Sequence, residues 1–132
     1  MLTPDLKTST TRIGEALICS FAGDVHMDNE EQIHRELNRA LAAHPGLLVI
    51  ELSAVGLFTS TALNALLIAR RAALDLGVPL VLAAPSPQAR RVLEITETDT
   101  VFDIAPSIAA ALYRTGVSVP GTARQTAPAC LN

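Results

Sequence analysis

The amino-acid sequence predicts a single α/β domain, with helices packed on a mixed sheet of four or five strands. Apolar runs of strand length alternate along the chain with segments of helical periodicity, and this alternation is typical of α/β folds. The chain has 132 residues, enough for one hydrophobic core but too few for two independent domains. Hydrophobic residues make up 49% of the sequence and aromatic residues only 3%, so Leu, Val, Ile and Ala must build that core. The predicted order of elements is β-β-α-β-α-β-α-β-α.

The first third of the chain predicts two strands and a helix. Residues 5–12 are rich in Thr, which favours a polar edge strand, and residues 15–22 form a stronger strand with one apolar face. Gly23 is expected to end this second strand. A helix then begins at Asp28, an N-cap residue that has Glu31 three positions later, as in a capping box. The apolar positions of this helix are Ile33, Leu37, Ala40 and Leu41.

The central segment predicts a buried strand and a second helix. Residues 47–52 are an almost uninterrupted apolar run, as expected of a strand buried on both faces. A turn is expected over residues 53–56, and the second helix then starts near Thr59 or Ser60. Gly77 is well placed to end this helix in the left-handed conformation. The inward stripe is predicted to be Leu63, Leu66, Leu67 and Leu74.

The remaining elements follow the same alternation. Residues 78–83 predict the next strand, and Ser86 followed by Pro87 marks the start of a third helix, an N-cap before a first-turn proline. A short strand over 101–104 and a helix from 106 to about 114 complete the predicted fold. The inward face of the third helix is expected to be Ala89, Val92, Leu93 and Thr96.

The composition indicates where the domain ends and which classes of partner are not expected. We expect the domain to occupy residues 1–115 and a flexible tail, without periodicity, to occupy residues 116–132. The net charge of −3 gives no long-range attraction to nucleic acid or anionic lipid, and no apolar run is long enough to span a bilayer. Cys19 and Cys130 show neither a CxxC spacing nor neighbouring His clusters, which argues against a disulfide or zinc framework. We therefore expect a cytoplasmic protein without metal or cofactor, and with neither nucleic acid nor membrane as a partner.

The centre of the chain carries the most specific pattern. Residues 51–67 contain Glu-Leu-Ser, a spacer, and then Thr-Ser-Thr-Ala-Leu ahead of a Leu-rich helix. This stretch resembles the signature of STAS domains, in which an acidic residue and Leu-Ser precede Asp-Ser-Ser/Thr-Gly-Leu. Residues 82–94 resemble the next strand and helix of that family, residues 96–102 its approach to the last strand, and residues 23–25 a turn near its N-terminus. The similarity covers about residues 12 to 113 and agrees with the predicted order of elements, so a single STAS-like domain is expected.

The resemblance implies a function in the bacterial anti-sigma factor antagonist branch of the family. In that branch, an unphosphorylated STAS protein regulates transcription by partner switching: it binds a GHKL-type serine-kinase anti-sigma factor and so releases a sigma factor. The kinase phosphorylates a Ser at the start of the second helix, and a serine phosphatase reverses the modification. Carried over residue by residue, the phosphoacceptor falls on Ser60, with Thr61 beside it. The implied partner-binding residues are Asp24, His26, Asp28, Leu57, Phe58, Thr59, Ser60, Thr61, Ala62 and Asn64.

Three positions depart from the family pattern. Thr59 stands where the family usually has Asp, Ala62 where it usually has Gly, and His26 where the N-terminal turn usually has its second acidic residue. The loss of the Asp removes a carboxylate from the start of the second helix, a common feature of the kinase's target.

Two other functions remain open. One is a STAS scaffold or decoy that docks proteins without being phosphorylated, in which case Ser60 and Thr61 serve only as helix caps. The other is an enzyme, for which the sequence offers no evident nucleophile–base pair and no set of metal-ligating residues.

Overall fold

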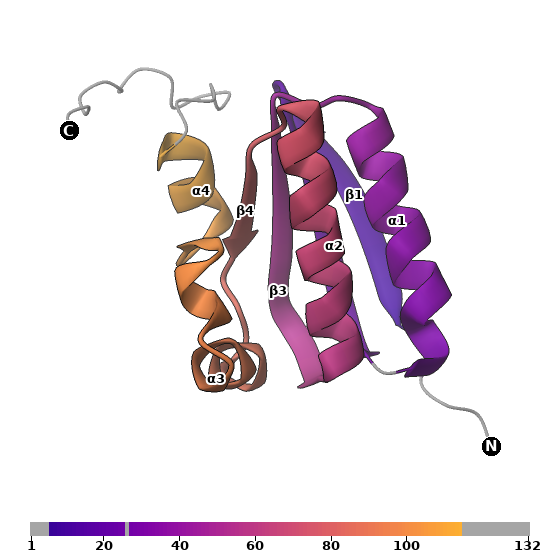
Figure 1. Cartoon of the computed structure of the whole chain (residues 1–132). Helices are drawn as coiled ribbons and strands as arrows, with labels where there is room; N and C mark the ends of the chain where they lie inside the picture. Colours follow the sequence, from indigo (N-terminus) through magenta and orange to yellow (C-terminus); the bar gives the residue numbers. More distant parts are fainter. Residues whose placement is uncertain (1–5, 26, 115–132) are drawn as a thin grey trace.

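The computed structural model describes residues 6–25 and 27–114, which form a five-stranded mixed sheet with four helices (Figure 1). The strands lie in chain order. β1 (Lys7–Ile13) is antiparallel to β2 (Ala16–Val25), while β3 (Leu47–Phe58), β4 (Leu80–Ala83) and β5 (Asp103–Ala105) continue the sheet in parallel. The predicted α/β class and the predicted order of elements are confirmed.

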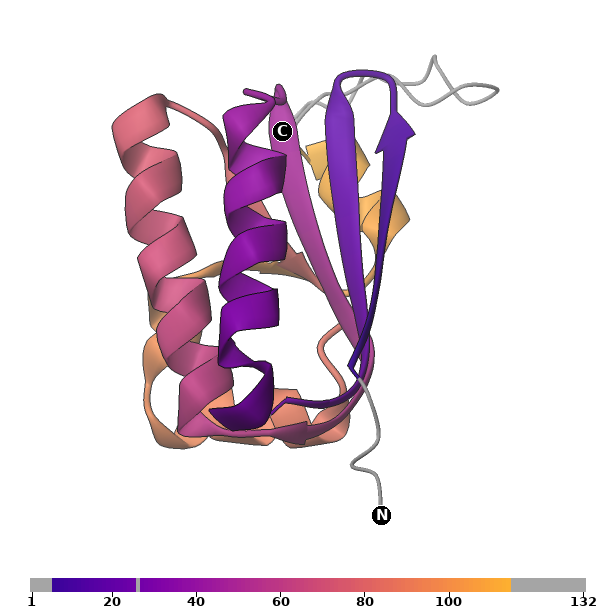
Figure 2. The ribbon, with the colours of Figure 1, turned by 90° about the vertical axis from the view of Figure 1, so that its right-hand side faces the viewer.

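A helix links each parallel pair of strands, as a parallel sheet requires. α1 (Glu30–Ala42) follows β2, α2 (Ser60–Leu76) follows β3 and α3 (Pro87–Ile95) follows β4. The view turned by 90° shows α1 and α2 on one side of the strands and α4 (Ile108–Arg114) on the other (Figure 2). The sheet is therefore covered on both faces, and β1 lies at one of its edges.

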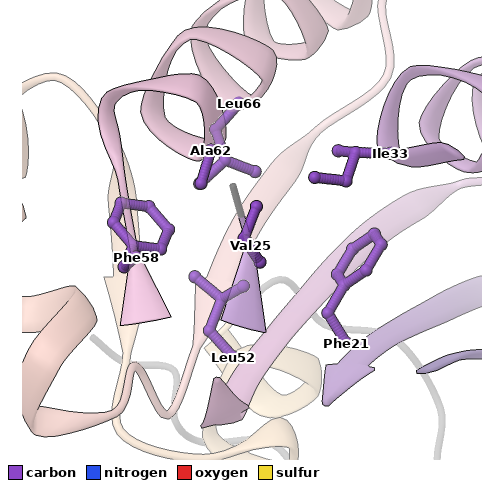
Figure 3. A pocket seen from close by; sticks show the side chains of 7 residues that line it. All are labelled: Phe21, Val25, Ile33, Leu52, Phe58, Ala62 and Leu66. Carbon is purple, nitrogen blue, oxygen red and sulfur yellow. The ribbon is translucent and has the colours of Figure 1, made fainter. Parts of the chain in front are cut away.

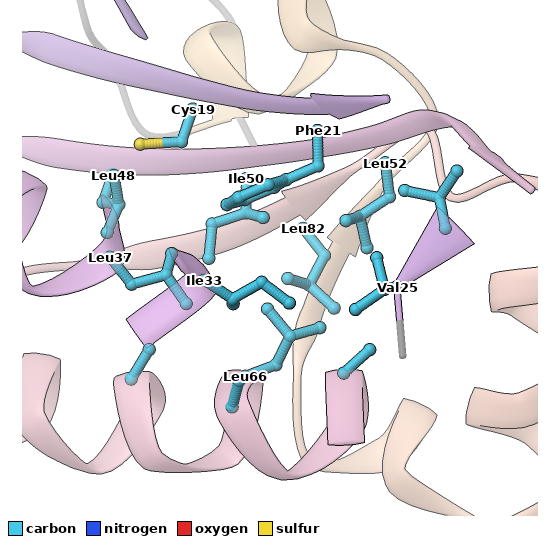
Figure 4. Packing of buried hydrophobic residues seen from close by; sticks show 14 of the residues in the cluster. Cys19, Phe21, Val25, Ile33, Leu37, Leu48, Ile50, Leu52, Leu66 and Leu82 are labelled. Atoms are coloured by element: carbon cyan, nitrogen blue, oxygen red, sulfur yellow. The ribbon is translucent and has the colours of Figure 1, made fainter. Parts of the chain in front are cut away.

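The hydrophobic core has two layers separated by the sheet. The larger cluster fills the space between the sheet and helices α1, α2 and α3, and it includes Leu48 and Ile50 of β3 (Figure 4). The smaller cluster lies against α4 and includes Leu47 and Val49 of the same strand. Because successive side chains of a strand point to opposite faces, the apolar run in β3 is buried on both sides, as the sequence predicted.

β2 and β3 are both longer than the sequence predicted. β2 does not end at Gly23 but continues to Val25, and β3 runs through the expected turn at residues 53–56 as far as Phe58. The cause is non-local pairing, since the two strands remain partners up to Val25 and Phe58, with register shifts that absorb the extra residues of β3. Gly23 has φ 114° within the strand, a conformation that glycine adopts without steric cost.

The helix α1 begins slightly later than the sequence predicted. Its N-cap is Asn29 rather than Asp28, because residues Met27–Asn29 form a 3₁₀ turn before the helix starts. The predicted apolar face of α1 is confirmed, and its buried residues are Ile33, Leu37, Ala40 and Leu41.

The inward stripe of α2 is made mostly of small residues. The helix starts at Ser60 and is followed by Gly77, which adopts φ 73°, as predicted from the sequence. Leu74, however, is 60% exposed, so its predicted place in the inward stripe is wrong. Leu63 and Leu66 of the predicted stripe are buried as expected, and alanines supply the other buried positions: Ala62, Ala65, Ala69 and Ala73.

The segment after α3 also differs from the prediction. Thr96 was expected on the inward face of α3 but is exposed, and its hydroxyl donates a hydrogen bond of 2.7 Å to the Val92 carbonyl at the helix end. The 3₁₀ turn Thr98–Thr100 follows, so β5 begins at Asp103 rather than at residue 101. The predicted tail, residues 116–132, lies outside the described residues.

The N-cap of α3 gives a stability prediction. Ser86 is 6% exposed, and its hydroxyl oxygen accepts a hydrogen bond of 3.2 Å from the Ala89 amide. We expect Ser86→Ala to lower the free energy of unfolding by about 1 kcal/mol, measured by urea denaturation. Ser9→Ala, at an exposed position of β1, is the control and should leave the midpoint unchanged. Equal stability of both variants would show that the cap contributes nothing.

Candidate functional site

The candidate site lies where β2 and β3 end and α2 begins. Thr59 is the N-cap of α2, with an extended backbone at ψ 178°, and Ser60 is the first helical residue. The first turn of α2 contains no acidic side chain. Its unpaired amides and the helix dipole give this end of the helix a positive partial charge, so an anionic group on the first turn is compatible with the fold.

The end of β3 is tied to β2 by a side chain. Gly23 pairs with Val55 and Val25 with Phe58, so that Asp24 alone lies opposite two residues of β3, in the manner of a β-bulge. The Leu57 amide donates a hydrogen bond of 3.0 Å to Oδ1 of Asp24. Gly56 makes room for this contact, because a Cβ added to it would lie 2.8 Å from the same oxygen.

A second side-chain hydrogen bond joins β2 to the residue that follows β3. The Thr59 hydroxyl donates a bond of 2.7 Å to the carbonyl oxygen of Val25, and the Thr59 side chain makes no capping hydrogen bond to α2. The residue that stands in place of the family's usual Asp therefore links α2 to the end of β2.

The three consecutive hydroxyl groups differ in their surroundings. Thr59 is half-buried and bonded to Val25, and Thr61 is half-buried in the first turn of α2. Ser60 is exposed, and its hydroxyl forms no hydrogen bond with any of residues 6–25 and 27–114. Of the three, Ser60 is the one that is exposed, and modification of its hydroxyl breaks no hydrogen bond with the described residues.

The predicted partner-binding residues differ in exposure, and Asp24, Thr59 and Thr61 are half-buried. Asp28, Leu57, Ser60 and Asn64 are exposed, and Leu57 and Asn64 flank Ser60 along the chain. Phe58 and Ala62 are instead buried in the core, at 3% and 4% exposure, so their side chains have almost no surface to offer. His26 lies outside the described residues. The hydrogen bonds at Asp24 and Thr59 hold the end of β2 beside the end of β3 and the start of α2.

Two residues of this region were not singled out from the sequence. Gly56 was treated as a turn residue, although its bare Cα is what admits the Asp24 carboxylate. Ile68 is 48% exposed one helical turn beyond Asn64 on α2. Its four-residue spacing from Asn64 is a signal that could have placed it on the same side of the helix.

A small apolar cavity lies beneath the first turns of α2 (Figure 3). Its volume is about 10 Å³, which is room for one water molecule at most. Side chains from β2, α1, β3 and α2 line it: Phe21, Val25, Ile33, Leu52, Phe58, Ala62 and Leu66. With no polar side chain in its wall, this cavity has no means of orienting a substrate or cofactor.

Other chemistry-bearing side chains are dispersed in the structure. Within residues 6–25 and 27–114 no three His, Cys, Asp or Glu side chains gather where they could hold a metal ion. No helix in the same ranges is long and apolar enough to cross a membrane. Cys19 of β2 is buried in the larger core cluster, and this burial raises the pKa of its thiol despite a weak hydrogen bond with Thr10. A thiol with a raised pKa is a poor nucleophile, which fits a structural role.

These observations define an α/β domain whose exposed candidate site is a serine hydroxyl at a helix start. The model of the STAS domain family matches residues 7–111, and the chain belongs to this family. The sequence has no significant match among curated proteins.

Solved structures support the same fold. An anti-sigma factor antagonist from Mycobacterium paratuberculosis is 25% identical, with a TM-score of 0.78 over 84% of this chain and 94% of that one. A putative anti-sigma factor antagonist from Thermotoga maritima is 17% identical, with a TM-score of 0.76 over 82% and 93% of the two chains. The anti-sigma factor antagonist SpoIIAA, in its unphosphorylated form, is 14% identical, with a TM-score of 0.68 over 83% and 95%.

Proposed function

We propose that this protein is a cytoplasmic anti-sigma factor antagonist that binds a GHKL-type serine-kinase anti-sigma factor and thereby releases a sigma factor. The observation that carries the proposal is the exposed, unbonded hydroxyl of Ser60 at the start of α2. Membership of the STAS family and the 25% identity to a mycobacterial anti-sigma factor antagonist support it. In this proposal the protein is a binding partner and a kinase substrate, not an enzyme.

The proposed docking surface centres on the outer side of α2. Leu57 and Ile68 are exposed apolar residues, at 38% and 48%, and Ser60 and Asn64 are exposed between them in the sequence. A partner that covers this surface would bury apolar area around an uncharged first turn. A phosphate on Ser60 would add about two negative charges to this surface and so weaken binding of the partner. A serine phosphatase that removes the phosphate would restore binding.

Phosphorylation is tested directly by mass spectrometry. We expect a cognate kinase, identified by screening the GHKL-type serine kinases of the same genome, to phosphorylate the full-length protein on Ser60 in the presence of ATP. Ser60→Ala should abolish the modification, whereas Thr61→Val, a matched control with a similar shape, should retain it. Modification of Thr61 in place of Ser60 would refute the assignment of the acceptor.

The substitution at Thr59 favours one alternative, the unswitched scaffold. Thr59 replaces the Asp that is usual in the family and uses its hydroxyl to hold Val25, so the first turn of α2 lacks a carboxylate. A scaffold of this kind would bind the kinase with the same surface but remain unmodified. Binding without any phosphorylation on Ser60 or Thr61, across all kinases that bind, would favour this alternative over the switch.

A further inference from the structure

Asp24 contacts the backbone of β3 directly, although the family resemblance implies that it binds a partner. Its side chain leaves β2 at the bulge, and its Oδ1 receives the Leu57 amide from a residue 33 positions later in the chain. A bulge removes a backbone partner from the ladder, and a backbone amide left without an acceptor is costly. The carboxylate therefore takes the place of the missing backbone acceptor.

The Asp24 carboxylate lies so close to Gly56 that the contact leaves no room for a side chain at position 56. Since a Cβ at Gly56 would lie 2.8 Å from Oδ1 of Asp24, any larger residue at this position would displace the carboxylate or the strand. The same contact can thus be broken from either side, by removing the carboxylate or by adding a methyl group at Gly56.

The hydrogen bond between Asp24 and Leu57 holds the chain shortly before the proposed phosphoacceptor. Leu57 is followed by Phe58, which is 3% exposed and anchored in the core, and by Thr59, which is bonded to Val25. Ser60 comes next. The conformation of residues 57–59 therefore sets where the Ser60 hydroxyl lies, and Asp24 fixes the first of these residues.

We propose that Asp24 is a positioning residue: its carboxylate holds the end of β3 through the Leu57 amide and so presents Ser60 to the kinase. This inference rests on the proposed function. It also revises the role that the family resemblance implies for Asp24, because a side chain that holds Leu57 acts on the partner through Ser60 rather than through direct contact.

The test compares two substitutions at Asp24. The side-chain oxygen of Asn can still accept the Leu57 amide, whereas Ala cannot. We expect Asp24→Ala to lower kcat/KM for phosphorylation of Ser60 by about tenfold or more, since a displaced acceptor is poorly aligned for transfer. Asp24→Asn should remain within about twofold of the wild type. Gly56→Ala is the second perturbation and should resemble Asp24→Ala. Asp99→Ala, in the exposed 3₁₀ turn after α3, is the control and should have no effect.

Hydrogen exchange of the Leu57 amide supplies a readout that needs no kinase. Its protection should fall in Asp24→Ala and Gly56→Ala and persist in Asp24→Asn, at temperatures where melting curves show all variants folded. An equal loss of kcat/KM in Asp24→Asn and Asp24→Ala, with the Leu57 amide still protected in Asp24→Asn, would overturn the proposal in favour of a charged partner contact. An unchanged kcat/KM in Asp24→Ala would overturn the positioning role but leave the proposed function intact. Failure of every kinase to modify wild-type Ser60 would overturn both.

Discussion

Ser60→Asp is expected to weaken binding to the kinase by at least about tenfold, the equivalent of 1.4 kcal/mol, whereas Ser60→Ala should bind as the wild type does. The reason is that a charge covered by the partner without a counter-charge costs several kcal/mol before relaxation. Ser60 is exposed in the free protein, so the cost arises only in the complex. Asp imitates a phosphate only in part, and phosphorylated wild-type protein should bind more weakly still.

The stability of the same variant should change little or rise. A carboxylate at the first turn of a helix interacts favourably with the helix dipole, by about 0.3–1 kcal/mol at low ionic strength. Ser60→Asp thus combines weaker binding with undiminished folding stability, a combination that a merely misfolded variant cannot give. Isothermal titration and thermal melts measure the two quantities.

Ser9→Asp, which adds the same charge on the exposed edge strand β1, is the matched control and should not affect binding. Equal affinities of Ser60→Asp and Ser60→Ala for the kinase would place Ser60 outside the interface. Ser60→Ala should also resist release of the kinase in the presence of ATP, because it cannot be phosphorylated.

The start of α2 could be predicted from the sequence because its determinants are local. Ser and Thr are residues of helix starts, apolar residues follow at helical spacing, and Gly77 provides the left-handed end. The buried strand at residues 47–52 was equally evident, since a continuous apolar run is the local signature of burial on both faces. In both cases neighbours in the sequence determine the structure.

The environment of Ser60 could not be predicted in the same way. The extension of β3 to Phe58 depends on pairing with β2, and the Asp24 contact joins residues that are 33 positions apart. No spacing rule links such positions. The sequence could place Asp24 and Leu57 in one region through the family resemblance, but only the register of the two strands reveals that they bond to each other.

The substitution at Ala62 has a different consequence from the one at Thr59. Ala62 is 4% exposed and lines the small cavity beneath α2, so its methyl group points into the core. The family's usual Gly at this position would enlarge the cavity and weaken the helix by about 1 kcal/mol. The departure at Ala62 therefore concerns the stability of α2 and leaves the outer side of the helix unchanged.

Leu82→Ala is expected to destabilise the fold more than any substitution at the start of α2. Leu82 lies in β4, is 0% exposed and belongs to the core cluster that the sheet shares with α1, α2 and α3 (Figure 4). Truncation of a fully buried Leu removes its transfer free energy and leaves a cavity, at a combined cost of about 2–5 kcal/mol. For a domain whose total stability is about 5–15 kcal/mol, this loss is a large fraction.

The melting temperature of Leu82→Ala should fall by roughly 8–20 °C, since 1 kcal/mol corresponds to about 4 °C in a domain of between 100 and 150 residues. Leu82→Met, which conserves the side-chain volume, should cost less than about 1.5 kcal/mol. Calorimetry of the wild type and the two variants compares these values. A shift of only a few degrees for Leu82→Ala would mean that the surrounding side chains collapse into the space.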